Sequence, residues 1–488
     1  MRALLLTTLL PLAVLPSCGT DSGTDTVVVS IDTDLPTPEV ATRTRIDLYT
    51  DAGSWFDSRE VDTSAQNSFP LTFGIKKGAA VRVRVRIYPQ GHVRPYEGER
   101  FADWPAVLQA PGQASPNRAP RLMNAGTDNT PETEPSPQVT VDRLVRIDTT
   151  QPDASPRIRL YGACAGTMAN LATWESCANT ARVRTKLGAP DKDLSLAPNL
   201  REACDPGASN DNVACIPGGV FVLGDHQNEI DYPPDEFLQV ATVRLARVRK
   251  FWIDRQEITV GRYRAAVARG FKPKQLEPAE NEGPFKPTPT KPTACTYSAK
   301  PRGREDYALS CAAFGTLRAL CQFEGGDLPT EAQWEYVARA AGGVSPRRYP
   351  WGNELPSCGG VLFGRVQDFG CQKDPWPLEL SVRDASGNPA WPLDRTPLDV
   401  YGLGGGLLEF VQDSVAEYTD PCFSDAPWDA ITCSGPDPDP GATDASIRRT
   451  ARGGSWISPP NFTRTTGRVK AALASPFTGA RCAYPTRP

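Results

Sequence analysis

Residues 27 to about 150 alternate between hydrophobic and polar positions, as β-strands with one buried face do. The clearest case runs from Val81 to Ile87, where apolar residues and arginines alternate strictly. Because successive side chains of a strand point to opposite faces, one face carries the apolar residues and the other carries Arg82, Arg84 and Arg86. We expect this arginine face to be a solvated strand surface, which is more common than a binding patch.

Further short apolar runs, separated by turn residues, predict the remaining strands of a small all-β sandwich. These runs lie at residues 27–31, 45–49, 144–148 and 158–161. Residues 102–140, rich in proline, alanine, asparagine and threonine, are expected to form a long loop. The predicted sandwich-like domain therefore covers residues 27–186, and the polar residues 187–210 are expected to link it to the rest of the chain.

The second half of the chain carries helical periodicity. Thr259 is expected to cap a helix over residues 260–269, and a second helix is expected over residues 306–323. A third helix begins with a predicted capping box formed by Thr330 and Gln333. Its buried stripe is predicted to comprise Trp334, Val337, Ala338 and Ala341.

The first 18 residues predict an export signal that ends in a lipid attachment site. Arg2 precedes an apolar run, Ala3 to Leu15, that is shorter than the about 20 residues of a membrane-spanning helix. The run leads into Leu-Pro-Ser-Cys, which resembles the cleavage box of bacterial lipoproteins, so Cys18 is expected to carry the lipid. Residues 19–26 are then a flexible tether. An ordinary secretory signal, with Cys18 incidental, is the alternative.

The cysteine count agrees with export. The chain has 13 cysteines, and the even remainder without Cys18 indicates a disulfide framework. Short spacings favour the pairs Cys164–Cys177, Cys204–Cys215, Cys358–Cys371 and Cys422–Cys433. Spacing alone leaves the other four cysteines open. Metal binding is the alternative, but the chain has no CxxC pair, and its two histidines are His92 and His226.

Composition excludes several classes of function. Apolar residues make up 39% and charged residues 23% of the chain, as in soluble globular proteins. The formal net charge of −4 leaves no basic excess for a nucleic-acid partner. The glycine-rich residues 402–406 lack the GK[ST] ending of a phosphate loop. Neither haem nor a nucleotide is therefore expected as a cofactor.

Six segments follow one another in order along the second half of the chain: PGGVFVLG (217–224), FWIDRQEIT (251–259), LPTEAQWEYVAR (328–339), YPWGN (349–353), RGGSW (452–456) and GARC (479–482). Together they resemble the formylglycine-generating enzyme family, also called the sulfatase-modifying factor domain. The resemblance implies that residues 211–488 have an α+β fold of the C-type-lectin-like kind with little regular structure. It also implies a disulfide between Cys321 and Cys482, which leaves Cys295 to pair with Cys311.

The resemblance implies a copper-dependent cysteine oxidase, but the residues for that chemistry are missing. The two copper-binding cysteines of the family lie three and eight residues beyond the serine of RGGS. Counted from Ser455, these positions hold Ser458 and Thr463. A hydroxyl provides neither the thiolate that Cu(I) prefers nor a mixed disulfide with substrate, so no copper is expected. A sister branch with histidine-ligated iron needs more histidines than His92 and His226.

The family also has a calcium site in a GNVWEW segment, which corresponds to residues 405–410. Glu409 retains the glutamate of that segment. Gly406 replaces its asparagine, and Gly402 replaces a preceding aspartate. Glu409 is therefore either a calcium ligand or a hydrogen-bond partner of a nearby loop.

These observations predict a non-catalytic cell-envelope lipoprotein whose C-terminal domain is a binding or structural module. Since glycine rather than aspartate follows Cys18, we expect the outer membrane, facing the periplasm or the surface. A groove for a peptide, a glycan or a protein partner is expected on the lectin-like fold. Its expected lining is Phe410, Arg452, Ser455, Trp456 and Ser458. The alternative is an active oxidase or another enzyme of the family with a non-standard site.

Overall fold

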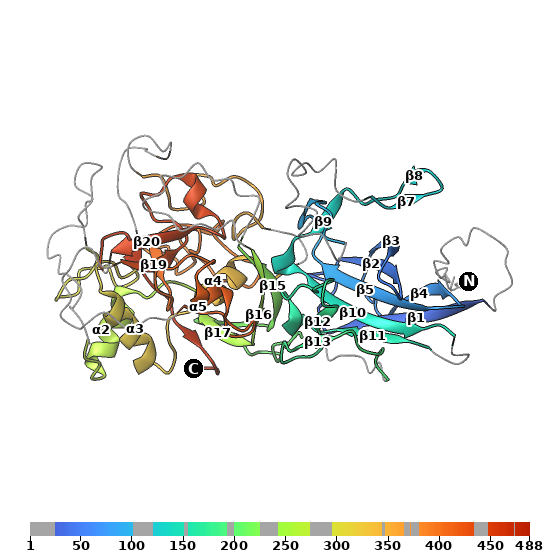
Figure 1. The fold of residues 1–488 in the computed structure, drawn as a ribbon. Helices are drawn as coiled ribbons and strands as arrows, with labels where there is room; N and C mark the ends of the chain where they lie inside the picture. Colours follow the sequence, from blue (N-terminus) through green and yellow to red (C-terminus); the bar gives the residue numbers. More distant parts are fainter. Residues whose placement is uncertain are drawn as a thin grey trace, which may run out of the picture.

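Two units lie side by side along the molecule in the computed structural model: a β-sheet unit and a mixed unit (Figure 1). The structure describes residues 25–100, 121–150, 155–192, 200–224, 243–273, 295–343, 347–365, 371, 380–433, 448–472 and 474–488. Cys18, His226 and the predicted signal lie outside these residues. Within the described part of the chain, no helix is long and apolar enough to cross a membrane.

The N-terminal unit is a sandwich of two sheets, as the alternation of hydrophobic positions predicted. The first sheet has the order β11 (Arg157–Leu160), β1 (Thr26–Thr33) and β4 (Leu71–Lys76). The second has the order β10 (Val141–Asp148), β5 (Ala80–Tyr88), β2 (Arg43–Thr50) and β3 (Trp55–Asp62). Buried side chains from both sheets, such as Val29, Ile31, Val83 and Val85, form one apolar core.

The other face of β5 differs from the expectation. Arg84 and Arg86 are only 3% and 1% exposed, so the predicted solvated arginine face is wrong for both side chains. Arg84 donates to Asp142 on the neighbouring strand at 2.6 Å, and Arg86 pairs with Asp47 and Glu134. The period of a strand shows which side chains share a face. It does not show that carboxylates from elsewhere will cover that face.

Part of this cover comes from the segment predicted as a long loop. Its described residues, with those just before it, contain short strands: β6 (Val93–Pro95), β7 (Met123–Asn124), β8 (Thr127–Asp128) and β9 (Thr133–Pro135). β6 pairs with β9, and Glu134 on β9 points a buried carboxylate at the arginines of the sheet. A hairpin of β12 (Glu175–Cys177) and β13 (Arg184–Lys186) completes the strands of this unit.

The C-terminal unit is α+β with short elements, as expected. Its helices are α2 (Val260–Ala268), α3 (Phe314–Phe323), α4 (Glu331–Ala338) and the single turn α5 (Pro421–Ser424). One sheet contains β14 (Val213–Ile216), β17 (Phe251–Asp254) and β22 (Ala483–Tyr484). A second pairs β15 (Gly219–Leu223) with β16 (Arg244–Val248). A third has the order β20 (Arg468–Ala472), β19 (Arg448–Arg452), β18 (Leu408–Phe410) and β21 (Thr478–Gly479).

Two of the three predicted helices begin where the sequence placed them. The Thr259 side chain accepts from the backbone of α2, and both hydrogen bonds of the Thr330–Gln333 capping box are present on α4. The second helix was predicted too long, because α3 begins at Phe314. Residues 306–313 are instead held by backbone pairing, in which Ala308 donates to Leu380 and Leu309 donates to Ile258, both at 2.8 Å.

The two units share one apolar core. Val220, Leu245 and Trp428 of the C-terminal unit belong to the same buried cluster as the interior of the sandwich. The Trp428 ring packs directly on Gly162, where an added Cβ would lie 2.5 Å from a ring carbon. The described part of the predicted linker is paired as well: Gly188 accepts from Arg146 at 2.9 Å.

Six disulfides join the twelve cysteines other than Cys18. The four pairs favoured by spacing and the two implied by the resemblance are all confirmed. They are Cys164–Cys177, Cys204–Cys215, Cys295–Cys311, Cys321–Cys482, Cys358–Cys371 and Cys422–Cys433.

Candidate functional site

The RGGSW segment begins with Arg452, the last residue of β19, and turns at Gly453. Gly453 has a φ of +75°, and a Cβ at this position would lie 2.3 Å from the carbonyl oxygen of Leu403. Glycine is required there because other residues rarely adopt this conformation and have no room. The turn carries the backbone N–H of Trp456 to the carbonyl of Gly406, at 2.8 Å. RGGSW is thereby attached to the glycine-rich segment before β18.

The two positions of the missing cysteines carry buried hydroxyl groups that are already engaged. The Ser458 hydroxyl lies 2.9 Å from that of Ser455 and accepts from the Ser455 backbone N–H, also at 2.9 Å. The Thr463 hydroxyl donates to the carbonyl of Pro460 at 2.7 Å. Ser458 is 5% exposed and Thr463 is 0% exposed. Both hydroxyls therefore stabilise the loop that follows RGGSW.

Copper does not fit this site. Cu(I) needs soft thiolate ligands, and Ser458 and Thr463 offer hard, neutral oxygens. Every cysteine among the described residues is bound in a disulfide, so none of them provides a substitute thiolate. The donor atoms present at the two positions therefore do not support the metal chemistry that the resemblance implies.

The residues predicted to line a groove are buried instead. Phe410, Arg452 and Trp456 are 0% exposed, and Ser455 is 1% exposed. Arg452 donates to Glu335 at 2.5 Å and to Glu331 at 3.4 Å. The predicted groove lining is therefore wrong. The motif suggested a surface site, but these side chains are buried, and Arg452 connects β19 to the glutamates of α4.

Glu409 accepts hydrogen bonds from two neighbouring side chains. Arg481 donates to both of its carboxylate oxygens, at 2.6–2.9 Å, and the Trp334 indole N–H donates to Oε2 at 2.7 Å. Both carboxylate oxygens of Glu409 are thus engaged by donors of the protein itself. In the part of the chain that the structure describes, no group of three or more His, Cys, Asp or Glu residues suits a metal ion. Calcium does not fit at Glu409, which acts as a hydrogen-bond partner.

A pocket that the sequence did not predict lies against the glycine-rich residues 402–406. We call it the acidic pocket, and its main lining residues are Glu257, Leu362, Leu380, Trp391, Asp394 and Tyr401. Glu257 accepts from the backbone N–H of Leu407 at 2.9 Å. Asp394 accepts from Gly404 at 3.0 Å and from Gly405 at 2.8 Å. Backbone amides therefore fix both carboxylates against the glycine-rich segment.

Burial changes the acidity of both carboxylates in the acidic pocket. It raises the pKa of Glu257 well above its usual range, and the nearby Glu409 carboxylate adds to this effect. It also raises the pKa of Asp394, to about 7. Glu257 lies within the FWIDRQEIT motif, which is the signal that could have identified it. Asp394 lies in no motif segment, and the fold alone brings it to Glu257.

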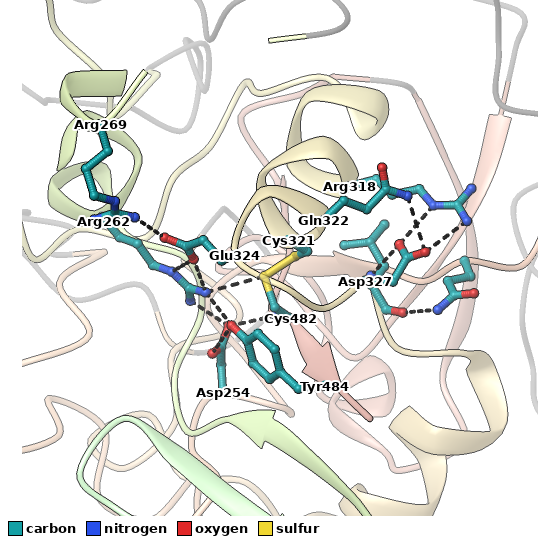
Figure 2. Close-up of a disulfide and its surroundings, with 12 residues drawn as sticks. Asp254, Arg262, Arg269, Arg318, Cys321, Gln322, Glu324, Asp327, Cys482 and Tyr484 are labelled. Atoms are coloured by element: carbon teal, nitrogen blue, oxygen red, sulfur yellow. Dashed lines mark hydrogen bonds and ion pairs between the residues drawn. A yellow bond between two sulfur atoms is a disulfide. The ribbon is translucent and has the colours of Figure 1, made fainter. Parts of the chain in front are cut away.

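A broad polar cleft of about 1050 Å³ runs along β17 and α2 and shares Gln256 and Glu257 with the lining of the acidic pocket. Figure 2 shows the Cys321–Cys482 disulfide and the side chains around it, of which Asp254, Arg262 and Tyr484 also line this cleft. Arg262 donates to Asp254 at 2.6 Å, to the Tyr484 hydroxyl at 2.7 Å and to the Cys482 sulfur at 3.4 Å. These charges neutralise one another, so the arrangement favours no single class of ligand.

Comparisons with known proteins agree with the motif segments. Residues 201–485 match the family described as "Sulfatase-modifying factor enzyme 1-like domain". The chain is 27% identical over 293 residues to the formylglycine-generating enzyme of Streptomyces coelicolor, covering 54% of this chain and 85% of that enzyme. It is 28% identical over 305 residues to the Thermomonospora curvata enzyme, with 56% and 92% covered. A solved structure, PvdO from Pseudomonas aeruginosa, covers 56% of this chain and 93% of its own, with 20% identity and a TM-score of 0.38.

Proposed function

Because the chain belongs to the sulfatase-modifying factor enzyme 1-like family, we propose that its C-terminal domain is a non-catalytic member that serves as a binding or structural module. One observation carries this proposal. The two positions that hold copper-binding cysteines in the family hold Ser458 and Thr463, whose hydroxyls are buried and engaged in local hydrogen bonds.

The cysteine inventory supports the same proposal. Twelve of the 13 cysteines form disulfides. The remaining one, Cys18, is proposed to carry a lipid. A disulfide sulfur is neither a nucleophile nor a thiolate ligand. The chain therefore has no reactive thiol left over for the oxidase chemistry of its relatives.

The proposed place of action is the cell envelope, with the lipid on Cys18 anchoring the chain to the outer membrane. The lipoprotein-like segment before Cys18 and the disulfide-rich composition support this location. The proposed partners are a peptide, a glycan or another envelope protein, and no nucleic acid. Copper, haem and nucleotide are proposed not to be cofactors.

A Cu(I) titration of the purified protein tests the absence of the oxidase site. The wild-type protein is expected to bind no Cu(I) tightly and to convert no cysteine of a test peptide to formylglycine. The double variant Ser458→Cys with Thr463→Cys serves as the positive control, because it places two thiols at the family positions. Tight Cu(I) binding or peptide oxidation by the wild type would overturn the proposal and favour the alternative, an active enzyme with a non-standard site.

A further inference from the structure

We call the part of the acidic pocket formed by Glu257 and Asp394 its floor. This floor offers few hydrogen-bond donors to the two carboxylates. Glu257 is 7% exposed and lines the cavity, and among the described residues it accepts one hydrogen bond, from Leu407 to Oε1. No described residue donates to its Oε2. A carboxylate oxygen of a buried residue that accepts no hydrogen bond is uncommon in folded proteins and calls for a donor from a ligand or a water molecule.

The same floor is short of positive charge. Three buried carboxylates, those of Glu257, Asp394 and Glu409, lie near one guanidinium group, that of Arg481. Of these three carboxylates, that of Glu409 accepts the hydrogen bonds of the Arg481 guanidinium group. Glu257 and Asp394 accept from backbone amides instead. A buried carboxylate without a cation is costly, so this floor favours either a proton or a bound cation.

Arg365 does not compensate for this shortage. Its guanidinium group lies over the Trp391 ring, 5.6 Å from the ring centroid. It donates to the carbonyls of Cys358 and Cys371, at 2.6 and 2.9 Å. Burial lowers the pKa of Arg365, and no carboxylate offsets that effect. The Arg365 side chain therefore contacts Trp391 and provides no positive charge to Glu257 or Asp394.

The walls of the pocket indicate which kind of cation would enter. Leu362, Leu380 and Trp391 belong to the apolar cluster around Trp456, and Tyr401 also lines the pocket. The pocket is open to one side, and its volume of about 30 Å³ admits a head group of the size of one or two water molecules. Apolar walls suit methylene groups, as they do around the stems of lysine side chains. We propose that the acidic pocket binds an alkylammonium group, such as a lysine side chain presented by a peptide or protein.

A bare metal ion fits the pocket less well. Both oxygens of Asp394 accept backbone N–H groups from Gly404 and Gly405, so they are not free to chelate together. No metal-binding group of three or more His, Cys, Asp or Glu residues is found in the described ranges. Hard cations such as calcium take six or more oxygen ligands, whereas one ammonium group needs about three acceptors.

The test is a calorimetric titration of the full-length protein with n-butylammonium chloride at neutral pH. n-Butanol serves as the neutral probe of similar shape, and calcium chloride serves as the metal probe. We expect saturable binding of butylammonium at least tenfold tighter than that of butanol. N-Acetyl-lysine methylamide, which carries the same head group, is expected to compete with butylammonium. The comparison among probes uses the wild-type protein and so does not depend on any variant folding.

Variants then localise the binding. Glu257→Gln and Asp394→Asn are each expected to weaken butylammonium binding at least tenfold. Glu354→Gln, at an exposed carboxylate, is the matched control and is expected to leave it unchanged. Equal binding of butanol and butylammonium, binding of calcium alone, or no binding of any probe would each overturn the inference.

The inference rests on the proposed function, because it names a ligand class for the proposed binding module. The two can fail separately. A missing butylammonium signal in a protein that also binds no Cu(I) refutes the acidic pocket as an amine site and leaves the proposed function standing. Tight Cu(I) binding refutes the proposed function, whatever the result with butylammonium.

Discussion

Arg86 lies fully buried between two carboxylates, Asp47 from the neighbouring strand β2 and Glu134 from β9. Although burial raises the pKa of Asp47, the guanidinium groups of Arg86 and Arg100 hold it below its usual value. Removing one partner of a buried ion pair leaves a charge without compensation. We expect Arg86→Met to lower the free energy of unfolding by about 3–5 kcal/mol in a urea titration.

The control for this variant is Arg59→Met on β3, the edge strand of the same sheet. Arg59 pairs with Asp57 at 2.8 Å, but its side chain is 42% exposed. Exposed ion pairs contribute about 1 kcal/mol or less. Equal losses for the two variants would show that the buried network contributes no more to stability than a surface pair.

Asp413 is a second residue whose buried surroundings shift its pKa. Its carboxylate is buried and accepts from the backbone N–H groups of Glu331 and Cys433, both at 2.6 Å. Burial, together with the Glu331 carboxylate, raises the pKa of Asp413 from 3.8 to about 6. The protonated form is therefore favoured in the folded state. Its contribution to stability is complete below pH 3.8 and is lost as the pH rises through about 6.

We expect the wild type to lose stability relative to Asp413→Asn as the pH rises from 4 to 7, because only the wild type titrates at this position. At about 1.4 kcal/mol per pKa unit, the change approaches about 3 kcal/mol. Urea titrations of both proteins across this pH range measure the difference, which removes the effects of other titrating groups. A difference that stays constant with pH would contradict the assignment.

At the scale of elements, α4 owes its start to the capping box of Thr330 and Gln333. The Thr330 hydroxyl accepts from the Gln333 backbone at 3.1 Å, and the Gln333 side chain accepts from the Thr330 backbone at 2.9 Å. We expect Thr330→Ala to cost about 1 kcal/mol of unfolding free energy, measured by chemical denaturation. Thr330→Ser keeps the hydroxyl and is expected to lose less. Equal losses would show that the methyl group, not the cap, carries the effect.

The elements also show which parts of the fold the sequence could predict. The caps of α2 and α4 and the apolar face of β5 follow from neighbours within a few residues, and all three were predicted. The start of α3 depends on backbone pairing with Ile258 and Leu380, which are distant in sequence, and it was missed. The burial of Arg84 was missed because Asp142 reaches it from another strand.

At the candidate site, too, the sequence could not predict contacts between residues that are distant in the chain. The loss of both copper ligands and the six disulfides could be derived from motif spacing, resemblance and counting. The acidic pocket could not, because Asp394 meets Glu257 only after folding. The predicted groove failed for the opposite reason: Arg452 and Trp456 lie in a motif, but a motif does not show which of its side chains are buried.

At the scale of the whole molecule, the sequence predicted two units and a linker, whereas the structure joins them through one apolar core. Trp428 makes that junction, because it is 6% exposed and packs on Gly162 of the sandwich and near Leu35. Its backbone carbonyl also accepts from Arg247 on β16 at 2.7 Å. Motion of one unit against the other would expose this core to water, so coupled unfolding is expected.

Replacing Trp428 tests this coupling. Truncating a buried tryptophan costs about 3–5 kcal/mol, and here the loss falls on the contact between the units. We expect the wild type to unfold in one calorimetric transition and Trp428→Ala to unfold in two, as each unit melts by itself. Trp174→Ala is the matched control, because Trp174 packs on Tyr49 within the sandwich. It should lower the melting temperature without separating the transitions, and two transitions in this control as well would refute a coupling specific to Trp428.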